Sequence, residues 1–171
     1  MAQHQRRLDR VLAPTYLEGL DGRTLDDIRA MQRECTDIET EVSYVRRLAQ
    51  ARIDILQAEL DRRAAGGSLG DLIDALPEIL ADSAPRSAAA NTRLATSLAP
   101  SMTIAWNRGL EHLVSDATLV NLPTLSDEEL RATMAQLREL EVEVSNTRRS
   151  LHTVLDAVER ELAHRITAGP D

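Results

Sequence analysis

Five polar side chains recur in the same order and at the same spacing in two segments of this 171-residue chain. Successive members lie 4, 3, 4 and 4 residues apart. At 100° per residue, five such positions fall within an arc of about 80° on a helix and span about 22 Å along it. We call each set a polar stripe. The first stripe is Glu39, Ser43, Arg46, Gln50 and Asp54, and the second is Glu141, Ser145, Arg148, His152 and Asp156.

The side-chain types in the two stripes suit a phosphorylated purine. A guanidinium can bind phosphate, or can pair in a fork with O6 and N7 of guanine. Carboxylates can accept hydrogen bonds from the N1–H and N2–H₂ groups of guanine, and Ser and Gln can donate to phosphate oxygens. Arg47 and Arg149 follow the motif arginines and extend the positive charge of each stripe. The stripes therefore favour a guanine nucleotide that carries phosphates.

Neither catalysis nor metal binding is favoured by these residues. The carboxylates lack a paired nucleophile, and no acid or serine is placed by spacing to form a triad with His152. A single histidine among scattered carboxylates is not a metal-ligand cluster, and the one cysteine, Cys35, excludes both a disulfide framework and a paired-cysteine zinc site. We expect no enzyme activity and no metal.

The elements that position the stripes form an internal repeat. When the chain is shifted by 102 residues, segments 26–63 and 128–165 align without a gap, and 12 of the 38 aligned pairs are identical. Thr24 and Ser126 precede the two segments as helix N-caps, and Ser126 forms a capping box with Glu129. Glycine follows each segment, at Gly66–Gly67 and at Gly169. The sequence therefore predicts two long helices.

Apolar residues recur at spacings of three and four along both helices, which predicts a coiled-coil seam. Each helix is roughly 40 residues, or about 60 Å, long. In the first helix the seam is predicted to contain Ile28, Met31, Cys35, Ile38, Val42, Val45, Ala49, Leu56 and Leu60; in the second it is predicted to contain Leu130, Leu137, Leu140, Val144, Leu151, Val154, Val158 and Leu162, with Thr133 and Thr147 in the remaining positions. Because each stripe lies near the middle of its helix, antiparallel pairing would place the stripes side by side.

The predicted fold is all-α, a long antiparallel coiled-coil helical hairpin with short additional helices. We expect a single domain over 1–171, with motif helices over 24–65 and 126–168 joined by a connecting segment over 66–125. Shorter features are predicted as well: a helical arm over 5–13, a short helix over 69–82 broken near Pro77, a flexible linker over 83–100, and an amphipathic helix over 103–122 that carries Trp106.

Composition narrows the classes of partner. The net charge is −8 and all 20 basic residues are arginine, which argues against a protein that binds DNA or a membrane surface through bulk positive charge. The absence of lysine excludes a P-loop lysine and Schiff-base chemistry. No apolar run reaches the length of a membrane span, and the first ten residues do not resemble a signal peptide. We expect a soluble, cytoplasmic protein.

The pattern Glu-x3-Ser-x2-Arg-x3-Gln-x3-Asp, found at residues 39, 43, 46, 50 and 54, resembles the cyclic-di-GMP-binding signature of the actinobacterial anti-sigma factor family RsiG. In that family the signature occurs on each helix of an antiparallel hairpin. The resemblance implies that two molecules of cyclic-di-GMP bind the stripes. It also implies that the loaded protein sequesters a sporulation sigma factor of the WhiG type, related to the flagellar sigma factors. The second copy departs from the signature at His152, where the first has Gln50.

Two other interpretations remain open at this stage. The chain can be a structural or adaptor coiled coil without a ligand, even a homodimer, in which the stripes are merely solvated faces. It can also be an enzyme that acts on nucleotides, although the sequence offers no nucleophile, base or metal cluster. Titration with cyclic-di-GMP separates a binding protein from the structural alternative, and product analysis separates binding from hydrolysis.

Overall fold

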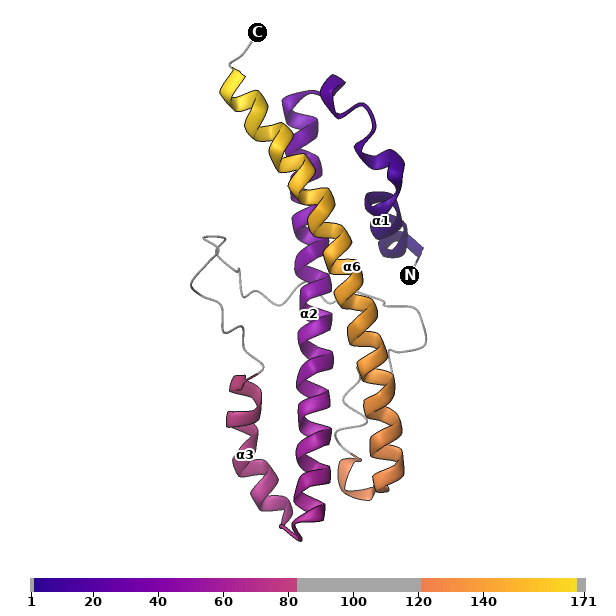
Figure 1. The fold of residues 1–171 in the computed structure, drawn as a ribbon, viewed down its shortest axis with the longest axis vertical. Helices are drawn as coiled ribbons and strands as arrows, with labels where there is room; N and C mark the ends of the chain where they lie inside the picture. Colours follow the sequence, from indigo (N-terminus) through magenta and orange to yellow (C-terminus); the bar gives the residue numbers. More distant parts are fainter. Residues whose placement is uncertain (1, 83–120, 169–171) are drawn as a thin grey trace. The chain divides into compact units, whose positions relative to one another are not determined.

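The computed structural model describes residues 2–82 and 121–168, which contain helices and their short connections and no strand. In chain order the elements are α1 (Ala2–Leu12), the 3₁₀ helices η1 (Pro14–Leu17) and η2 (Leu20–Gly22), α2 (Leu25–Ala64), α3 (Leu69–Asp82), the 3₁₀ helix η3 (Leu122–Thr124) and α6 (Asp127–Ala168) (Figure 1). The expected linker over 83–100 and nearly all of the expected helix over 103–122, including Trp106, lie outside the described residues.

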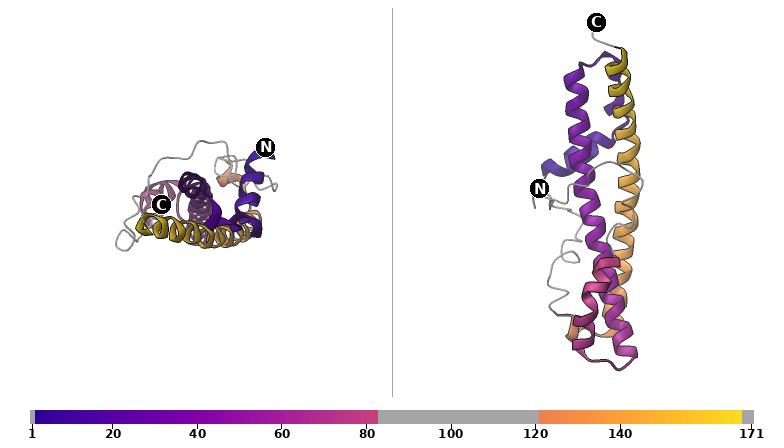
Figure 2. Two further views of the ribbon diagram at one scale, coloured as in Figure 1. Left: turned by 90° about the horizontal axis from the view of Figure 1, so that it is seen from above. Right: turned by 90° about the vertical axis from the view of Figure 1, so that its left-hand side faces the viewer.

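The described residues form two compact units. Unit 1 holds residues 2–44 and 144–168, and unit 2 holds residues 45–82 and 121–143, so that α2 and α6 each contribute a segment to both units. In each unit a segment of α2 lies beside a segment of α6 (Figures 1 and 2).

In each unit the segments of α2 and α6 run in opposite directions. In unit 1, Gln32 of α2 donates to Glu159 of α6, and further along α2 Glu39 accepts a hydrogen bond from Arg148. In unit 2, the amide of Gln50 donates to Glu141, and further along α2 Arg63 pairs with Asp127. Residue numbers in α6 fall as those in α2 rise, which is the register of an antiparallel pair. The predicted all-α fold, with two long antiparallel helices and short additional ones, is confirmed.

Helix α2 begins and ends as its sequence predicts. Thr24 Oγ1 accepts from the Asp27 amide while Asp27 Oδ2 accepts from the Thr24 amide, each at 3.2 Å, so the first helix also starts with a full capping box. At the other end, Gly66 adopts φ +69°, and the Gly67 amide donates to the carbonyl of Arg62. This is a Schellman ending, for which glycine is favoured because it enters the left-handed region without strain.

The buried positions of α2 follow a regular 3-4 spacing over its whole length. Eight of the nine predicted seam residues are buried, and Leu60 is half-buried. The regular row also includes two charged residues, Arg52 and Glu59, which are 4% and 0% exposed. A continuous 3-4 row is typical of helices that pack as a coiled coil.

In α6, six of the ten predicted seam positions are buried and the other four are half-buried. Met134 and Leu155 are buried instead of the adjacent Thr133 and Val154, which are half-buried. Leu162 and Thr147 are the other two half-buried positions. Met134 is buried because a third element packs in unit 2: it belongs to an apolar cluster with Leu72 of α3 and Leu122 of η3. A helix that contacts two neighbours buries a wider arc than one seam requires.

The predicted break in the helix over 69–82 is wrong, because α3 continues through Pro77. Proline removes the amide that would donate to the carbonyl of Ile73. Ile73 and Pro77 are both on the exposed side of α3, so water can solvate the carbonyl that has lost its donor. Leu72 and Ile79, on the other side of α3, pack against the apolar cluster of unit 2.

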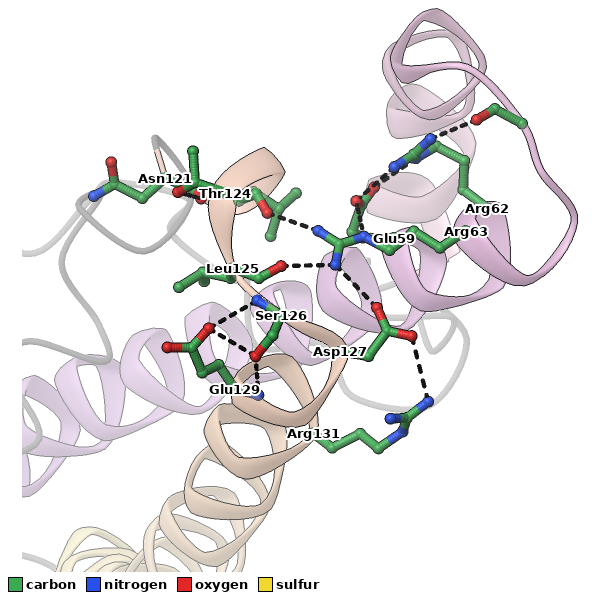
Figure 3. A network of polar contacts seen from close by, with 12 residues as sticks. Glu59, Arg62, Arg63, Asn121, Thr124, Leu125, Ser126, Asp127, Glu129 and Arg131 are labelled. Atoms are coloured by element: carbon green, nitrogen blue, oxygen red, sulfur yellow. Dashed lines mark hydrogen bonds and ion pairs between the residues drawn. The ribbon is translucent and has the colours of Figure 1, made fainter.

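Equivalent arginines of the repeat hold the loop in front of the opposite helix. In unit 2, Arg63 of α2 donates to the carbonyls of Leu122 and Leu125 and pairs with Asp127 at 2.9 Å (Figure 3). In unit 1, Arg165 of α6, which is 102 residues later, donates to the carbonyls of Leu20, Asp21 and Arg23. These carbonyls belong to η3 and η2 and the residues after them, so the repeat includes a 3₁₀ turn and its arginine clamp.

The N-terminal segment of unit 1 folds back on α2. Arg10 of α1 pairs with Glu34 of α2, and the hydroxyl of Tyr16 donates to the same carboxylate. The thiol of the buried Cys35 donates to the Tyr16 oxygen at 3.9 Å, and burial raises the pKa of both groups. The predicted helical arm over 5–13 is therefore a helix, and it is anchored through Glu34.

Candidate ligand-binding site

In unit 1, four stripe residues from the two long helices contact one another around Glu39. Arg148 Nε donates to Glu39 Oε1 and to Ser43 Oγ, both at 2.9 Å, and Ser43 Oγ donates to Glu39 Oε1 at 2.7 Å. His152 Nε2 is buried, forms no hydrogen bond with a described residue, and lies 3.4 Å from the same carboxylate oxygen. We call Glu39, Ser43, Arg148 and His152 the Arg148 cluster.

The environment of Glu39 favours its charged form. Burial alone raises the pKa of this carboxyl, but the hydrogen bonds from Ser43 and Arg148, together with the positive charge of Arg148, outweigh burial and lower the pKa. Glu39 is therefore an anion at neutral pH. Its negative charge occupies the place beside Arg148 that an external anion would take.

In unit 2, three stripe residues form an equivalent arrangement around Glu141. Gln50 Nε2 donates to Glu141 Oε1 at 3.2 Å, and Arg46 Nη1 lies 3.6 Å from the same oxygen. The Nε atom of Arg46 is buried and has no hydrogen-bond partner among residues 2–82 and 121–168. We call Arg46, Gln50 and Glu141 the Arg46 cluster.

The two clusters are related by the repeat, with the helices exchanged. In one, an acid of α2 meets an arginine and an imidazole of α6; in the other, an acid of α6 meets an arginine and an amide of α2. The side chains of Arg46 and Arg148 are 28% and 38% exposed, so both are accessible in part. Each cluster offers a guanidinium, a carboxylate and a neutral polar group, as a phosphorylated guanine requires. The expected contact between stripes from opposite helices is confirmed in each unit.

The remaining stripe residues differ in burial. Asp54 and Ser145 are half-buried, whereas Asp156 is exposed. Arg149 is exposed and donates to Asn146 of its own helix, so the structure does not bring it to either cluster. Within residues 2–82 and 121–168, no three His, Cys, Asp or Glu side chains gather as metal ligands would.

Sequence reasoning missed the arginine clamps and the charged residues of the seam. Arg63 and Arg165 are an identical pair in the repeat, as are Glu59 and Glu161, and none of them is in the stripes. That identity was the signal that could have revealed them. Glu59 accepts hydrogen bonds from Arg62 and Arg63, at 2.7 Å and 2.6 Å (Figure 3). These bonds lower the pKa of its carboxyl although burial opposes them.

A family model described as RsiG-like matches residues 14–80 and 116–171, which include both stripes and both arginine clamps. The chain belongs to the RsiG-like family. Membership makes it an anti-sigma factor of this family, with a sigma factor as its class of partner. No curated protein matches the chain. Among the helices of its described part, none is both long and apolar enough to cross a membrane.

Proposed function

We propose that this RsiG-like protein is an anti-sigma factor regulated by cyclic-di-GMP. In this proposal two molecules of the dinucleotide bind the chain, one held by each cluster. The loaded protein then sequesters a sigma factor of the WhiG or flagellar type from RNA polymerase, in the cytoplasm. The protein has no catalytic role in this scheme.

The observation that carries the proposal is that the same chemical set is assembled twice. Most polar lines on a coiled coil are solvated faces whose ion pairs contribute little. Here, by contrast, an acid and an arginine from opposite helices meet in each unit, and Ser43 in one cluster and Gln50 in the other donate a hydrogen bond to the acid. The acid in each cluster is only about one-fifth exposed (21% for Glu39 and 22% for Glu141). One guanidinium in each cluster can bind a phosphate, which fits one dinucleotide held at each cluster.

Calorimetric titration of the full chain with cyclic-di-GMP tests this proposal. We expect two ligands per chain and weaker binding at higher salt, because phosphates meet arginines at partly exposed positions. Cyclic-di-AMP is the matched control. Its bases lack the N1–H and N2–H₂ groups from which Glu39 and Glu141 can accept hydrogen bonds, so cyclic-di-AMP should bind with much lower affinity. Equal affinities for the two dinucleotides would exclude guanine recognition, and no heat from either would favour the structural coiled coil.

Chromatography of the ligand after incubation provides the second arm of this experiment. A binding protein returns cyclic-di-GMP unchanged, whereas an enzyme returns a linear dinucleotide or mononucleotides. Recovery of a cleaved product would contradict the assignment of a regulatory role.

A further inference from the structure

The arginines of the two clusters differ in the acceptors that they already have. Arg148 Nε donates to both Glu39 Oε1 and Ser43 Oγ at 2.9 Å. Arg46 Nε is buried without an acceptor in the described part of the chain, and Nη1 of this guanidinium lies 3.6 Å from a carboxylate oxygen of Glu141. The two side chains are 28% and 38% exposed, so both guanidiniums are accessible in part.

This difference affects the affinity for an anion at each arginine. A phosphate that takes the Nε–H donor of Arg148 must replace a charge-assisted hydrogen bond to Glu39, and that bond type is roughly twice as strong as a neutral one. At Arg46 no such bond has to be broken. A buried donor without an acceptor is also unfavourable, so a phosphate bound there removes a cost that the free protein carries.

We propose that Glu39 is an internal competitor for phosphate at Arg148, so that the Arg46 cluster fills first and the Arg148 cluster second. The proposal rests on the proposed function in that it treats both clusters as phosphate sites. Glu39 is then a positioning residue. It holds Arg148 in the free protein, and on ligand binding it exchanges that arginine for another donor, such as the N1–H of guanine. The two halves of the repeat thus serve as unequal sites.

The test follows the Nε–H signals of the two arginines by ¹⁵N NMR in the full chain, assigned with R46K and R148K. The probe is inorganic pyrophosphate. Because it has phosphate oxygens but no base, the responses report phosphate binding alone and do not depend on base recognition. We expect the Arg46 signal to respond at a concentration at least about fivefold lower than the Arg148 signal. Responses at equal concentrations, in the reverse order, or at neither arginine would overturn the proposal.

Two matched variants identify the cause of this difference. E39Q removes the competing charge, so the Arg148 signal should respond at a concentration within about twofold of the Arg46 signal. E141Q, the equivalent change in the other cluster, should leave the Arg148 response unchanged. An E39Q chain that keeps the wild-type difference would contradict the role of Glu39. A parallel titration with cyclic-di-GMP separates the competition by Glu39 from the identity of the ligand. If the arginine signals respond to pyrophosphate as expected but not to cyclic-di-GMP, the competition is supported and cyclic-di-GMP is rejected as the ligand.

Discussion

At the scale of the residue, Arg46 and Arg148 are the side chains on which ligand binding should depend most. Substitution of either by alanine removes charge-assisted hydrogen bonds to phosphate, so we expect a loss of about 2 kcal/mol or more in binding, roughly 30-fold in affinity. Arg29 and Arg131 are matched controls, because they are also an equivalent pair of the repeat but lie on exposed surfaces. Calorimetry should show near-normal binding by the control variants. A normal affinity in Arg46→Ala with a much lower melting temperature would make this arginine structural.

Arg63 is expected to act on stability rather than on ligand binding. Arg63→Ala removes the hydrogen bonds to the carbonyls of Leu122 and Leu125. It also removes the hydrogen bond that Arg63 donates to the buried Glu59, to which Arg62 continues to donate. We expect a loss of about 2 to 3 kcal/mol in the free energy of unfolding, measured by urea denaturation. The exposed Arg138 provides the control, and Arg138→Ala should change stability by less than about 0.5 kcal/mol. Equal unfolding curves for the two variants would contradict the clamp.

The lowered pKa of Glu59 gives this clamp a definite pH dependence. A carboxyl with a depressed pKa in the folded state contributes stability above its unfolded pKa of about 4.3, and that stability is lost as the pH falls toward the folded value. Stability from this group should thus be constant between pH 7 and pH 5 and should fall below about pH 4.3. The Glu59→Gln variant should be less stable than the wild type at pH 7. Its free energy of unfolding should fall less than that of the wild type as the pH drops below about 4.3. Parallel profiles for the two proteins would reject this contribution.

At the scale of the element, the paired helices depend on the buried row of the seam. Val144 is 0% exposed, whereas Val142, on the same helix, is 57% exposed. Val144→Asp buries an unpaired charge and should cost about 4 kcal/mol or more, with loss of the folding transition in a thermal melt. Val142→Asp makes the same chemical change in solvent and should melt within a few degrees of the wild type. Similar melts for both variants would show that α6 does not pack through this row.

The long helices could be predicted from the sequence because three local signals agree. Thr24 and Ser126 are N-cap residues, glycine follows each segment in the sequence, and the 3-4 spacing of apolar residues continues between these signals. The positions that differed depend on neighbours that the spacing does not reveal. Met134 is buried through α3 and η3 rather than through the seam, and Pro77 remains helical because it lies on the exposed side of α3.

The candidate site could also be predicted in part from patterns in the sequence. Duplication revealed which polar residues to compare, and antiparallel pairing implied that residues of opposite stripes meet. The partner of each side chain could not be predicted, because hydrogen bonding depends on differences of about 1 Å. For example, Arg148 Nε lies 2.9 Å from Glu39 Oε1, whereas Arg46 Nη1 lies 3.6 Å from Glu141 Oε1, although the two arginines are equivalent in the repeat.

At the scale of the whole molecule, ligand binding must change the affinity for the sigma factor if the protein is a switch. In each unit a cluster joins α2 to α6, so a bound dinucleotide replaces contacts that hold these two helices together. A partner that contacts both helices then meets a different surface. The acidic net charge of −8 is complementary to a basic DNA-binding partner and should speed the association. In the proposed switch this charge is not sufficient, because it does not distinguish the free protein from the loaded one.

Linkage sets the size of this effect in both directions. Whatever factor cyclic-di-GMP adds to the affinity for the sigma factor, the sigma factor adds to the affinity for cyclic-di-GMP. The most direct test is therefore to titrate cyclic-di-GMP into the chain alone and into an equimolar mixture with a WhiG-type sigma factor. We predict two ligands per chain in both titrations and tighter binding in the mixture, by at least about tenfold, with no complex isolated when the ligand is omitted. A stable complex without ligand, or the same ligand affinity in the two titrations, would contradict the account.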